Sequence, residues 1–195
     1  MCGDWRVMSV KKLQQSLKEA PVVKKGEYNY VVHPITDGVP WITPELLNEV
    51  TDEMQKRIAQ CGKIDKIVTM EAMGIPLAAA LSLKMNIPFT IIRKRTYGLP
   101  GEVSIEQVTG YSKTQLHING LKKGDTIVIV DDVLSTGGTL RAVLSVLKTM
   151  DVEIKGVFIA VDRGNVAENI TKDSDVPIDA LVEINIVDGE TIIKS

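Results

Sequence analysis

The chain has 195 residues, of which 44% are apolar and 25% are charged, and its formal net charge is −2. This length and composition favour a single domain of α/β size with a hydrophobic core of its own. A nearly neutral chain with no apolar run of roughly 18 residues is not expected to bind nucleic acid or to enter a membrane.

The cysteines and histidines argue against a metal centre and against a disulfide framework. Cys2 and Cys61 have no metal-ligand spacing, and His33 and His117 lie far apart with no other ligand type nearby. The first ten residues lack the basic and apolar regions of a secretion signal. We therefore expect free thiols and a cytoplasmic location.

The first third of the chain predicts two helices around an irregular segment. Residues 9–19 carry apolar side chains at helical spacing, and a proline follows them. Residues 26–41 are rich in Gly, Pro, Tyr and Trp, which is typical of an irregular loop. A second helix is predicted from Thr43 to about Cys61, because Pro44 suits the first helical position and a glycine follows the end.

From residue 66 onward, short apolar strands alternate with helices. Such alternation predicts βαβ units, and strands that are apolar along their whole length indicate a parallel sheet covered on both faces. The fold class is therefore α/β, with a mainly parallel twisted sheet flanked by helices, and residues 180–195 close the chain as a hairpin of strands. The predicted strands are residues 66–70, 89–92, 126–131, 156–162 and 180–186, and the predicted helices between them are residues 75–85 and 138–150.

The segment 96–112 interrupts this alternation. It is long, contains Gly98, Pro100, Gly101 and Gly110, and lacks the pattern of a buried strand. Long loops inside compact domains are often lids over active sites. We predict a mobile loop that closes over a site.

The most informative stretch is VIVDDVLSTGGTL, residues 128–140. An apolar strand ends at Asp131 and Asp132 and a helix begins at about Gly138, so the turn between them lies at the carboxyl edge of the sheet, where α/β proteins bind ligands. Backbone N–H groups of this turn can point at an anion, with the helix dipole behind them. We predict that a monophosphate binds there. The turn, called the phosphate loop below, consists of Ser135, Thr136, Gly137, Gly138 and Thr139.

The two acids beside this loop need a different partner. Carboxylates accept hydrogen bonds, and the vicinal hydroxyls of a ribose offer two donors, so Asp131 and Asp132 are predicted to hold the sugar of a ribose phosphate. The acids also favour a cation, which suits a magnesium-loaded sugar diphosphate. The alternative to a sugar-phosphate site is a strand, a turn and a helix without a ligand, in which the acids are solvated and lie near the helix N-terminus, where negative charge is favoured. The turn lacks the lysine of a Walker sequence and does not match a dinucleotide-binding fingerprint.

Four blocks of the sequence resemble the purine phosphoribosyltransferases. VIVDDVLSTGGTL is similar to the family's phosphoribosyl-pyrophosphate motif, and KIVTMEAMGIPLAAALSLKMNIPF resembles the strand and pyrophosphate loop of the adenine and xanthine enzymes. IIRKRTYGLPGE resembles the lead into the mobile loop of the adenine enzymes. Together with HPITDGVPWITPELL, the pattern looks most like the archaeal hypoxanthine/guanine phosphoribosyltransferases, over about residues 9–195.

The resemblance implies a type I phosphoribosyltransferase fold in one domain, residues 1–195, with a hood from about residues 20–42 and 180–195 and a lid loop at about 96–112. It implies transfer of the phosphoribosyl group from phosphoribosyl pyrophosphate to hypoxanthine, and also to guanine, in purine salvage. Mg²⁺ would enter with the substrate without a direct protein ligand, and the expected oligomer is a homodimer. The residues that the resemblance assigns to pyrophosphate are Glu71, Ala72, Met73, Gly74, Arg93, Lys94 and Arg95.

The resemblance also points to residues for the purine base. Arg163 ends the strand after the phosphate-loop helix, where related xanthine enzymes have a lysine that faces the exocyclic oxygen of the purine. A fixed donor suits the carbonyl of hypoxanthine or guanine and opposes the amino group of adenine. A surface ion pair is the alternative for Arg163. An aromatic or apolar cover for the base is expected from residues 28–41, where Tyr30, His33, Ile35 and Trp41 are available, and His33 and Ile35 are taken as further base-binding candidates.

The catalytic acid or base stays unassigned, because the chain departs from the family pattern at two places. Adenine enzymes have a glutamate before the last tyrosine of the mobile loop, where Gly110 stands here. Hypoxanthine-guanine enzymes of the animal and bacterial type have an aspartate where Ser135 stands. The candidates that remain are Asp131, Asp132 and Glu106.

Three other functions remain open from the sequence. The first is the same reaction on adenine or xanthine. The second is a regulator that senses phosphoribosyl pyrophosphate without catalysis, although a net charge of −2 argues against a DNA-binding regulator. The third is a nucleotide-binding α/β protein that transfers nothing.

Overall fold

The computed structural model describes residues 10–26, 28–109 and 112–194. Its centre is a six-stranded sheet in the order β10-β9-β8-β7-β3-β4. Neighbouring strands are parallel except for β10, which pairs antiparallel with β9. This confirms the predicted α/β class with a mainly parallel sheet. The strands are β3 Lys66–Met70, β4 Phe89–Ile92, β7 Thr126–Leu134, β8 Glu153–Arg163, β9 Ile178–Val187 and β10 Glu190–Lys194.

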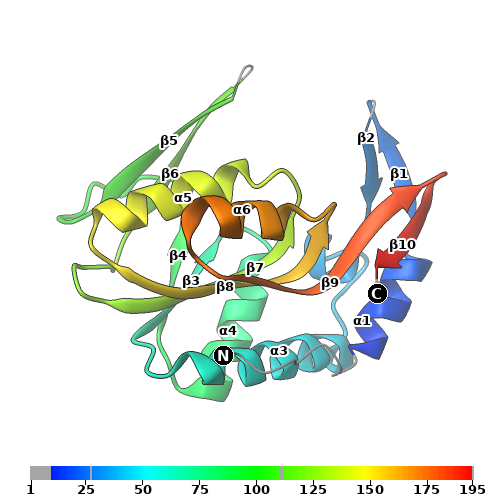
Figure 1. Ribbon diagram of the computed structural model, residues 1–195, viewed down its shortest axis with the longest axis horizontal. Coiled ribbons are helices and arrows are strands. Elements are labelled where there is room, and N and C mark those ends of the chain that lie inside the picture. Colours follow the sequence, from blue (N-terminus) through cyan, green and yellow to red (C-terminus); the bar gives the residue numbers. More distant parts are fainter. Residues whose placement is uncertain (1–9, 27, 110–111, 195) are drawn as a thin grey trace.

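Helices cover both faces of the sheet. Helices α5 and α6 lie on one face and α3 and α4 on the other, while α1 lies beside β10 at one end (Figure 1). Apolar side chains of the helices and strands form two buried clusters. This two-sided cover explains why the central strands are apolar along their length. The helices are α1 Lys11–Glu19, α2 Pro34–Asp37, α3 Pro44–Ile58, α4 Gly74–Met85, α5 Gly138–Thr149 and α6 Val166–Ser174, and a short 3-10 helix η1 covers Ala59–Cys61.

Two hairpins stand outside the sheet, and the sequence did not predict either. Strands β1 Val22–Lys25 and β2 Tyr28–Val31 form the first, and β2 lies inside the segment 26–41 that was expected to be irregular. Strands β5 Val103–Thr109 and β6 Ser112–Ile118 form the second. The prediction of a loop over residues 96–112 was therefore wrong for the part that belongs to β5 and β6.

The second hairpin is amphipathic, which explains why it was missed. Ile105, Leu116 and Ile118 are buried and belong to the cluster that includes α5, whereas Ser104 and Gln115 are exposed. A strand with one solvated face shows only alternate apolar residues. In the sequence, the glycines and the proline of this segment indicated a loop more strongly than the short alternating pattern indicated two strands.

Helix α6 was also missed, because only two of its side chains, Ala167 and Ile170, are buried. Its N-terminus is fixed from the end of β8. The carboxylate of Asp162 accepts hydrogen bonds from the N–H groups of Val166 (3.2 Å) and Ala167 (3.0 Å). This cap orients the turn that follows Arg163.

The hairpin β1–β2 and the C-terminal strands β9 and β10 lie side by side at one end of the molecule (Figure 1). The end of α1, the start of β1 and residues 189–193 of the β9–β10 hairpin line a hollow of about 710 Å³. The antiparallel pairing of β9 with β10 confirms the closing hairpin. These are the segments from which a hood was predicted, and the division of the chain into one domain with a hood stays a prediction.

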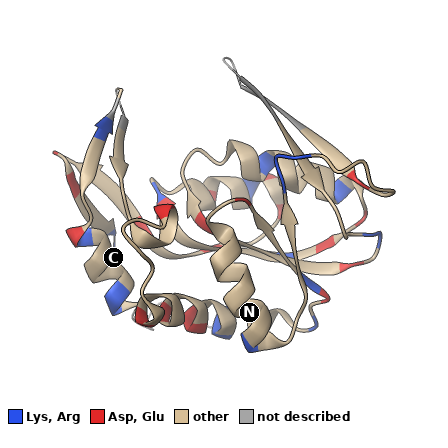
Figure 2. Ribbon diagram, turned by 180° about the vertical axis from the view of Figure 1, so that it is seen from behind, with Lys and Arg blue, Asp and Glu red and all other residues tan. Residues whose placement is uncertain are grey.

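Charged side chains of both signs are distributed over the helices, the loops and the strands (Figure 2). The formal net charge of −2 agrees with this mixture. Among the described residues, no helix combines the length and the apolar character needed to cross a membrane.

Arg57 of α3 pairs with Glu53 of the same helix and with Asp179 of β9, and so ties α3 to β9. Its Nε donates to Glu53 at 3.1 Å and its Nη1 donates to Asp179 at 2.6 Å. Burial raises the pKa of Asp179, and Arg57 opposes that rise. We expect Arg57→Ala to lower the free energy of unfolding by roughly 3 to 5 kcal/mol, because the largely buried Asp179 would lose its cation and Glu53 would keep only Lys56 at 3.5 Å. Urea unfolding at neutral pH measures the loss.

Lys84→Ala is the matched control for this change, because Lys84 pairs with Asp52 at a partly exposed position. Removal of that pair is expected to cost less than about 1 kcal/mol. Equal losses in the two variants would contradict a special role for the buried pair of acids.

Candidate functional site

The carboxyl ends of β3 and β7 open into one pocket of about 240 Å³. The two strands are neighbours in the sheet, so the turn after β3 and the phosphate loop after β7 meet at the same edge. The pocket gathers residues from three groups that the sequence had singled out. These lining residues are Glu71, Lys94, Asp131, Asp132 and the phosphate loop, Ser135–Thr139.

The phosphate loop joins β7 to α5 and packs tightly against α6. Gly137 has a φ of 74°, in the left-handed region, and a Cβ atom there would lie 2.4 Å from Cδ1 of Ile170. Both the conformation and the space therefore require glycine at this position. Helix α5 begins at Gly138, so the N–H groups of its first turn are available to an anion in the pocket.

Asp131 and Asp132 form a hydrogen-bonded acid pair beside the phosphate loop. Burial and the neighbouring Asp132 raise the pKa of Asp131 well above its ordinary value. Burial also raises the pKa of Asp132 to about 6, and only 7% of this residue is exposed. Two acids that resist ionisation in this way gain most from a ligand that donates hydrogen bonds or carries positive charge.

The turn after β3 lies very close to the acid pair. A Cβ atom at Gly74 would lie 2.5 Å from Oδ1 of Asp131 and 2.2 Å from Oγ1 of Thr69. The peptide bond between Glu71 and Ala72 is cis. Met73 lies against Gly38, away from the acids. The close approach of Gly74 is what brings the N-terminus of α4 to the pocket.

The three basic residues after β4 point to different places. The Nε of Arg93 pairs with Oε2 of Glu71 at 2.5 Å, and Lys94 lines the pocket. The guanidinium of Arg95 lies over the ring of Tyr97, 5.7 Å from its centroid. Of the three, Lys94 is therefore the cation that faces the pocket.

A second, smaller pocket of about 120 Å³ adjoins the first, because Val133 and Ser135 line both. Arg163 lies in it, as the sequence had suggested for a base-binding residue. Its walls come from five separate parts of the chain. The lining residues are Leu17, Tyr30, Val31, Thr36, Val133, Ser135, Val161, Arg163 and Ile184.

His33 and Ile35 do not line this smaller pocket. His33 is fully buried, its Nδ1 accepts a hydrogen bond from the N–H of Ile35 at 3.1 Å, and its Nε2 lies 2.8 Å from Oγ of Ser16. Burial lowers the pKa of His33 to about 4, so the ring is neutral at physiological pH. Ile35 is 1% exposed and packs in the core. Both side chains stabilise the start of α2 below the pocket.

Sequence reasoning missed most of the residues that line the smaller pocket. Val133 and Ile184 come from β7 and β9, which β8 separates in the sheet, so only the fold brings them together. Tyr30, from the separate β1–β2 hairpin, had been named from the sequence as available to cover the base. Nothing in the sequence around Ile184 distinguishes it from a core residue.

The remaining catalytic candidate lies on the β5–β6 hairpin. Glu106 belongs to β5, where it is paired with Gln115, but its side chain lies outside the described residues, as does Gly110. The segment before the hairpin is fixed by Glu102. Its carboxylate accepts hydrogen bonds from Nδ2 of Asn119 (2.8 Å) and from the N–H of Tyr97 (2.9 Å), which with Thr96 lower its pKa to about 2.

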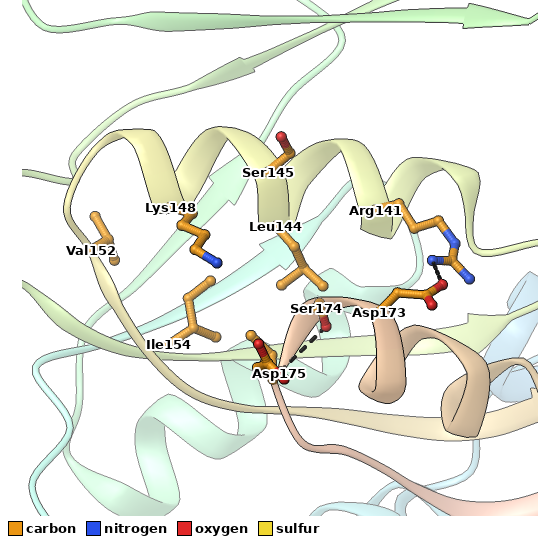
Figure 3. A pocket seen from close by; sticks show the side chains of 10 residues that line it. Arg141, Leu144, Ser145, Lys148, Val152, Ile154, Asp173, Ser174 and Asp175 are labelled. Atoms are coloured by element: carbon orange, nitrogen blue, oxygen red, sulfur yellow. Dashed lines mark hydrogen bonds and ion pairs between the residues drawn. The ribbon is translucent and has the colours of Figure 1, made fainter.

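Another hollow, of about 490 Å³, lies between α5 and α6 and contains none of the candidate residues (Figure 3). Arg141 and Asp173 pair with each other at its rim, and Leu144 and Ile154 contribute apolar surface. It runs along α5 from Arg141 to Lys148 and includes no residue of the phosphate loop. The chemistry of the two adjoining pockets therefore defines the candidate active site.

The chain is similar to known proteins over nearly its whole length. Residues 42–187 match the family model described as the phosphoribosyl transferase domain. A protein of Methanocaldococcus infernus named hypoxanthine/guanine phosphoribosyltransferase is 54% identical over 183 residues, which are 94% of this chain and 100% of that protein. A protein of the same name from Methanobacterium paludis is 52% identical over 94% of this chain and 95% of its own length.

Solved structures of adenine phosphoribosyltransferases have the same fold. The enzyme from Leishmania tarentolae matches with a TM-score of 0.73 and 17% identity, over 90% of this chain and 88% of that one. The enzyme from Rhodothermus marinus matches with a TM-score of 0.71 and 21% identity, over 89% of this chain and 97% of that one. At such low identities these likenesses show the fold alone.

Proposed function

The chain belongs to the phosphoribosyltransferase family, and we propose that it transfers the phosphoribosyl group of phosphoribosyl pyrophosphate to hypoxanthine and guanine. The products are the purine nucleoside monophosphate and pyrophosphate, as purine salvage requires. The observation that carries this proposal is the pairing of two pockets. A phosphate loop and an acid pair line one of them, and Arg163 lines the other, which shares Val133 and Ser135 with the first.

In the proposed complex, the main-chain N–H groups of the phosphate loop and of the first turn of α5 bind the 5′-phosphate. Asp131 and Asp132 accept hydrogen bonds from the ribose hydroxyls. Lys94 and the turn from Glu71 to Gly74 bind the pyrophosphate. The reacting carbon of the sugar then lies where the two pockets meet, beside Val133 and Ser135.

The reaction forms a bond between a ring nitrogen of the purine and the anomeric carbon, and it breaks the bond from that carbon to pyrophosphate. Positive charge builds on the sugar as the leaving group departs. The acid pair stabilises that charge, and Lys94 stabilises the negative charge on pyrophosphate, so catalysis rests on positioning and electrostatics. Asp131, Asp132 and Glu106 remain the candidates for accepting the proton of the purine.

The residues of the larger pocket fit a cation that is held mainly by substrate oxygens. Asp131 and Asp132 offer carboxylate oxygens, which Mg²⁺ prefers, and no group of three or more His, Cys, Asp or Glu side chains among the described residues could hold a metal ion. When bound with phosphoribosyl pyrophosphate, Mg²⁺ would neutralise part of the diphosphate charge.

A panel of bases tests this function. The protein is incubated with Mg²⁺, phosphoribosyl pyrophosphate and either hypoxanthine, guanine, xanthine or adenine, and both pyrophosphate release and nucleotide formation are measured. We expect products from hypoxanthine and guanine. Product from adenine or xanthine alone would replace the proposed substrates, and no product from any base would overturn the enzymatic function.

Base selection is expected to depend on Arg163. A guanidinium donates to the exocyclic oxygen of an oxopurine and faces no acceptor on the amino group of adenine. Arg163→Ala should lower kcat/KM for hypoxanthine by about 10- to 100-fold, the worth of one charge-assisted hydrogen bond. Arg141→Ala, which removes an exposed ion pair with Asp173, should leave this value unchanged. An equal loss for every base would count against selection by Arg163.

A homodimer and a cytoplasmic location belong to the same proposal. Light scattering of the purified chain, at concentrations near those used in the assay, measures the oligomer directly. A monomer that turns over at the full rate would remove the dimer from the proposal without affecting the reaction.

A further inference from the structure

Arg163 is held in the smaller pocket by the β1–β2 hairpin. Its Nη2 donates to the backbone carbonyl of Asn29 at 2.7 Å, and its guanidinium lies over the ring of Tyr30, 5.6 Å from the centroid. In the described parts of the chain, no carboxylate forms an ion pair with Arg163. Its orientation therefore depends on two contacts with one hairpin, which is far from it in the sequence.

Tyr30 is itself fixed in place from below. Its hydroxyl donates to Oδ1 of Asp37 at 2.7 Å. Asp37 in turn accepts from the N–H of His33 at 2.9 Å and from Oγ1 of Thr36 at 2.6 Å. The hydrogen bond to Asp37 and burial raise the pKa of Tyr30 to about 12, so the phenol is protonated and donates throughout the physiological range.

We propose that Tyr30 is a positioning residue that determines base specificity: it holds the guanidinium of Arg163 at the rim of the smaller pocket, ready for the exocyclic oxygen of an oxopurine. This inference rests on the proposed function and extends it to a residue of the hairpin. Tyr30 acts through Arg163, so its contribution exists only while Arg163 is present.

The chemistry of a guanidinium explains why such a support is needed. An arginine side chain has several rotatable bonds, and an unsupported one would extend into solvent. The ring of Tyr30 attracts the cation through its face and leaves the planar edge of N–H groups free. One N–H is used by the carbonyl of Asn29, and the others remain for a ligand carbonyl.

The hairpin network is also within electrostatic reach of the acid pair. Asp37 contributes to the raised pKa of Asp132, and Asp132 contributes to the raised pKa of Tyr30. The support for the base-binding arginine and the acids proposed to hold the sugar are therefore neighbours. The purine and the sugar would therefore bind in one connected site.

Steady-state kinetics of Tyr30→Leu and Tyr30→Phe test the inference. Loss of the ring in Tyr30→Leu should raise the KM for hypoxanthine by about 3- to 30-fold, the range expected for a cation–π contact. The KM for phosphoribosyl pyrophosphate should change by less than about twofold, since its sites lie in the other pocket. Tyr30→Phe keeps the ring and should restore most of the affinity for hypoxanthine.

A double-mutant cycle separates positioning from a merely structural role. In the Arg163→Ala background, Tyr30→Leu should have no further effect on the KM for hypoxanthine, because nothing remains to be positioned. Val23→Ala is the matched control, since Val23 is the cross-strand partner of Tyr30 and is exposed. Val23→Ala should leave kcat, the KM for hypoxanthine and the KM for phosphoribosyl pyrophosphate unchanged. Equal effects of Tyr30→Leu with and without Arg163 would overturn the proposal.

A measurement without substrate keeps this inference distinct from the proposed function. The guanidinium Nε–H signal of Arg163 is identified by its absence in Arg163→Ala, and its heteronuclear NOE reports whether the group is ordered. We expect an ordered group in the wild type and in Tyr30→Phe, and a mobile one in Tyr30→Leu. If Arg163 stayed ordered in Tyr30→Leu, the positioning role of Tyr30 would be overturned even if the enzyme proved active. If the panel of bases gave no product, the NOE measurement would still test whether Tyr30 orders Arg163.

Discussion

Replacement of both Asp131 and Asp132 by asparagine is expected to reduce turnover by on the order of 10³-fold, with the loss in kcat rather than in folding. The two carboxylates are proposed to hold the ribose hydroxyls and to stabilise the positive charge that builds on the sugar. Asparagine is nearly isosteric but has no charge, so the sugar could still be contacted while the charge would be left without a partner. Initial rates with saturating substrates measure the loss.

The same double variant should be more stable than the wild type near neutral pH. The pKa of Asp132 is raised from 3.8 to about 6 in the folded protein, so the folded state binds this proton more tightly than the unfolded chain does. The stability that this proton contributes is fully present below about pH 4 and is lost as the pH rises through about 6. At pH 7 the wild type therefore carries a cost of up to roughly 3 kcal/mol that asparagine avoids.

Urea unfolding of the ligand-free protein between pH 4 and pH 8 measures this difference. The advantage of the double variant should be small at the acid end and largest above about pH 6. Asp188→Asn, at an exposed turn position with a φ of 51°, is the control and should change neither turnover nor this pH dependence. Wild-type rates in the double variant would refute the role of the acids, and a constant stability difference across the range would refute their raised pKa values.

The sequence predicted the half of the site that is built from consecutive residues. The phosphate loop and the acid pair are local, because a strand that ends in acids and a glycine-rich turn before a helix fix their own geometry. The position of Lys94 is predictable for the same reason, because it follows the carboxyl end of β4, at the same edge of the sheet. Such features are visible without knowledge of the strand order.

The walls of the smaller pocket, which we propose for the base, could not be brought together by sequence reasoning, since they belong to segments that only the fold places side by side. Tyr30 lies beside Arg163 because the β1–β2 hairpin stands over the end of β8, and Ile184 reaches the same pocket from β9. His33 illustrates the opposite error. A histidine in a segment rich in aromatic residues suggested a ligand contact, yet the residue is buried as a hydrogen-bonded cap for α2.

Gly74→Ala is expected to reduce turnover at least 100-fold through a single added methyl group. The new Cβ atom would lie 2.2 Å from Oγ1 of Thr69, 2.5 Å from Oδ1 of Asp131 and 3.2 Å from the carbonyl oxygen of Val130. All three atoms belong to central strands of the sheet or to their ends, so either the acid or the start of α4 must move. A displacement of about 1 Å at a reacting centre costs on the order of 10²-fold in rate.

Helix propensity and packing predict opposite results for this substitution, which makes it informative. Gly74 is a helical residue without a positive φ, so alanine alone would favour α4 by about 1 kcal/mol. Overpacking costs roughly 1 to 3 kcal/mol and should outweigh that gain, so the melting temperature should fall. Ala79→Gly in the same helix is the control, because it lowers stability by about 1 kcal/mol without touching the acid pair. It should leave turnover unchanged.

Thr69→Ala should rescue part of the activity that Gly74→Ala removes. Oγ1 of Thr69 is buried and has no hydrogen-bond partner among the described residues, so its removal costs little and opens the closest of the three contacts. The contact with Asp131 persists, and recovery should therefore be incomplete. Wild-type turnover in Gly74→Ala would mean that the acid does not need its present position, and the proposal that Asp131 holds the sugar would fall with it.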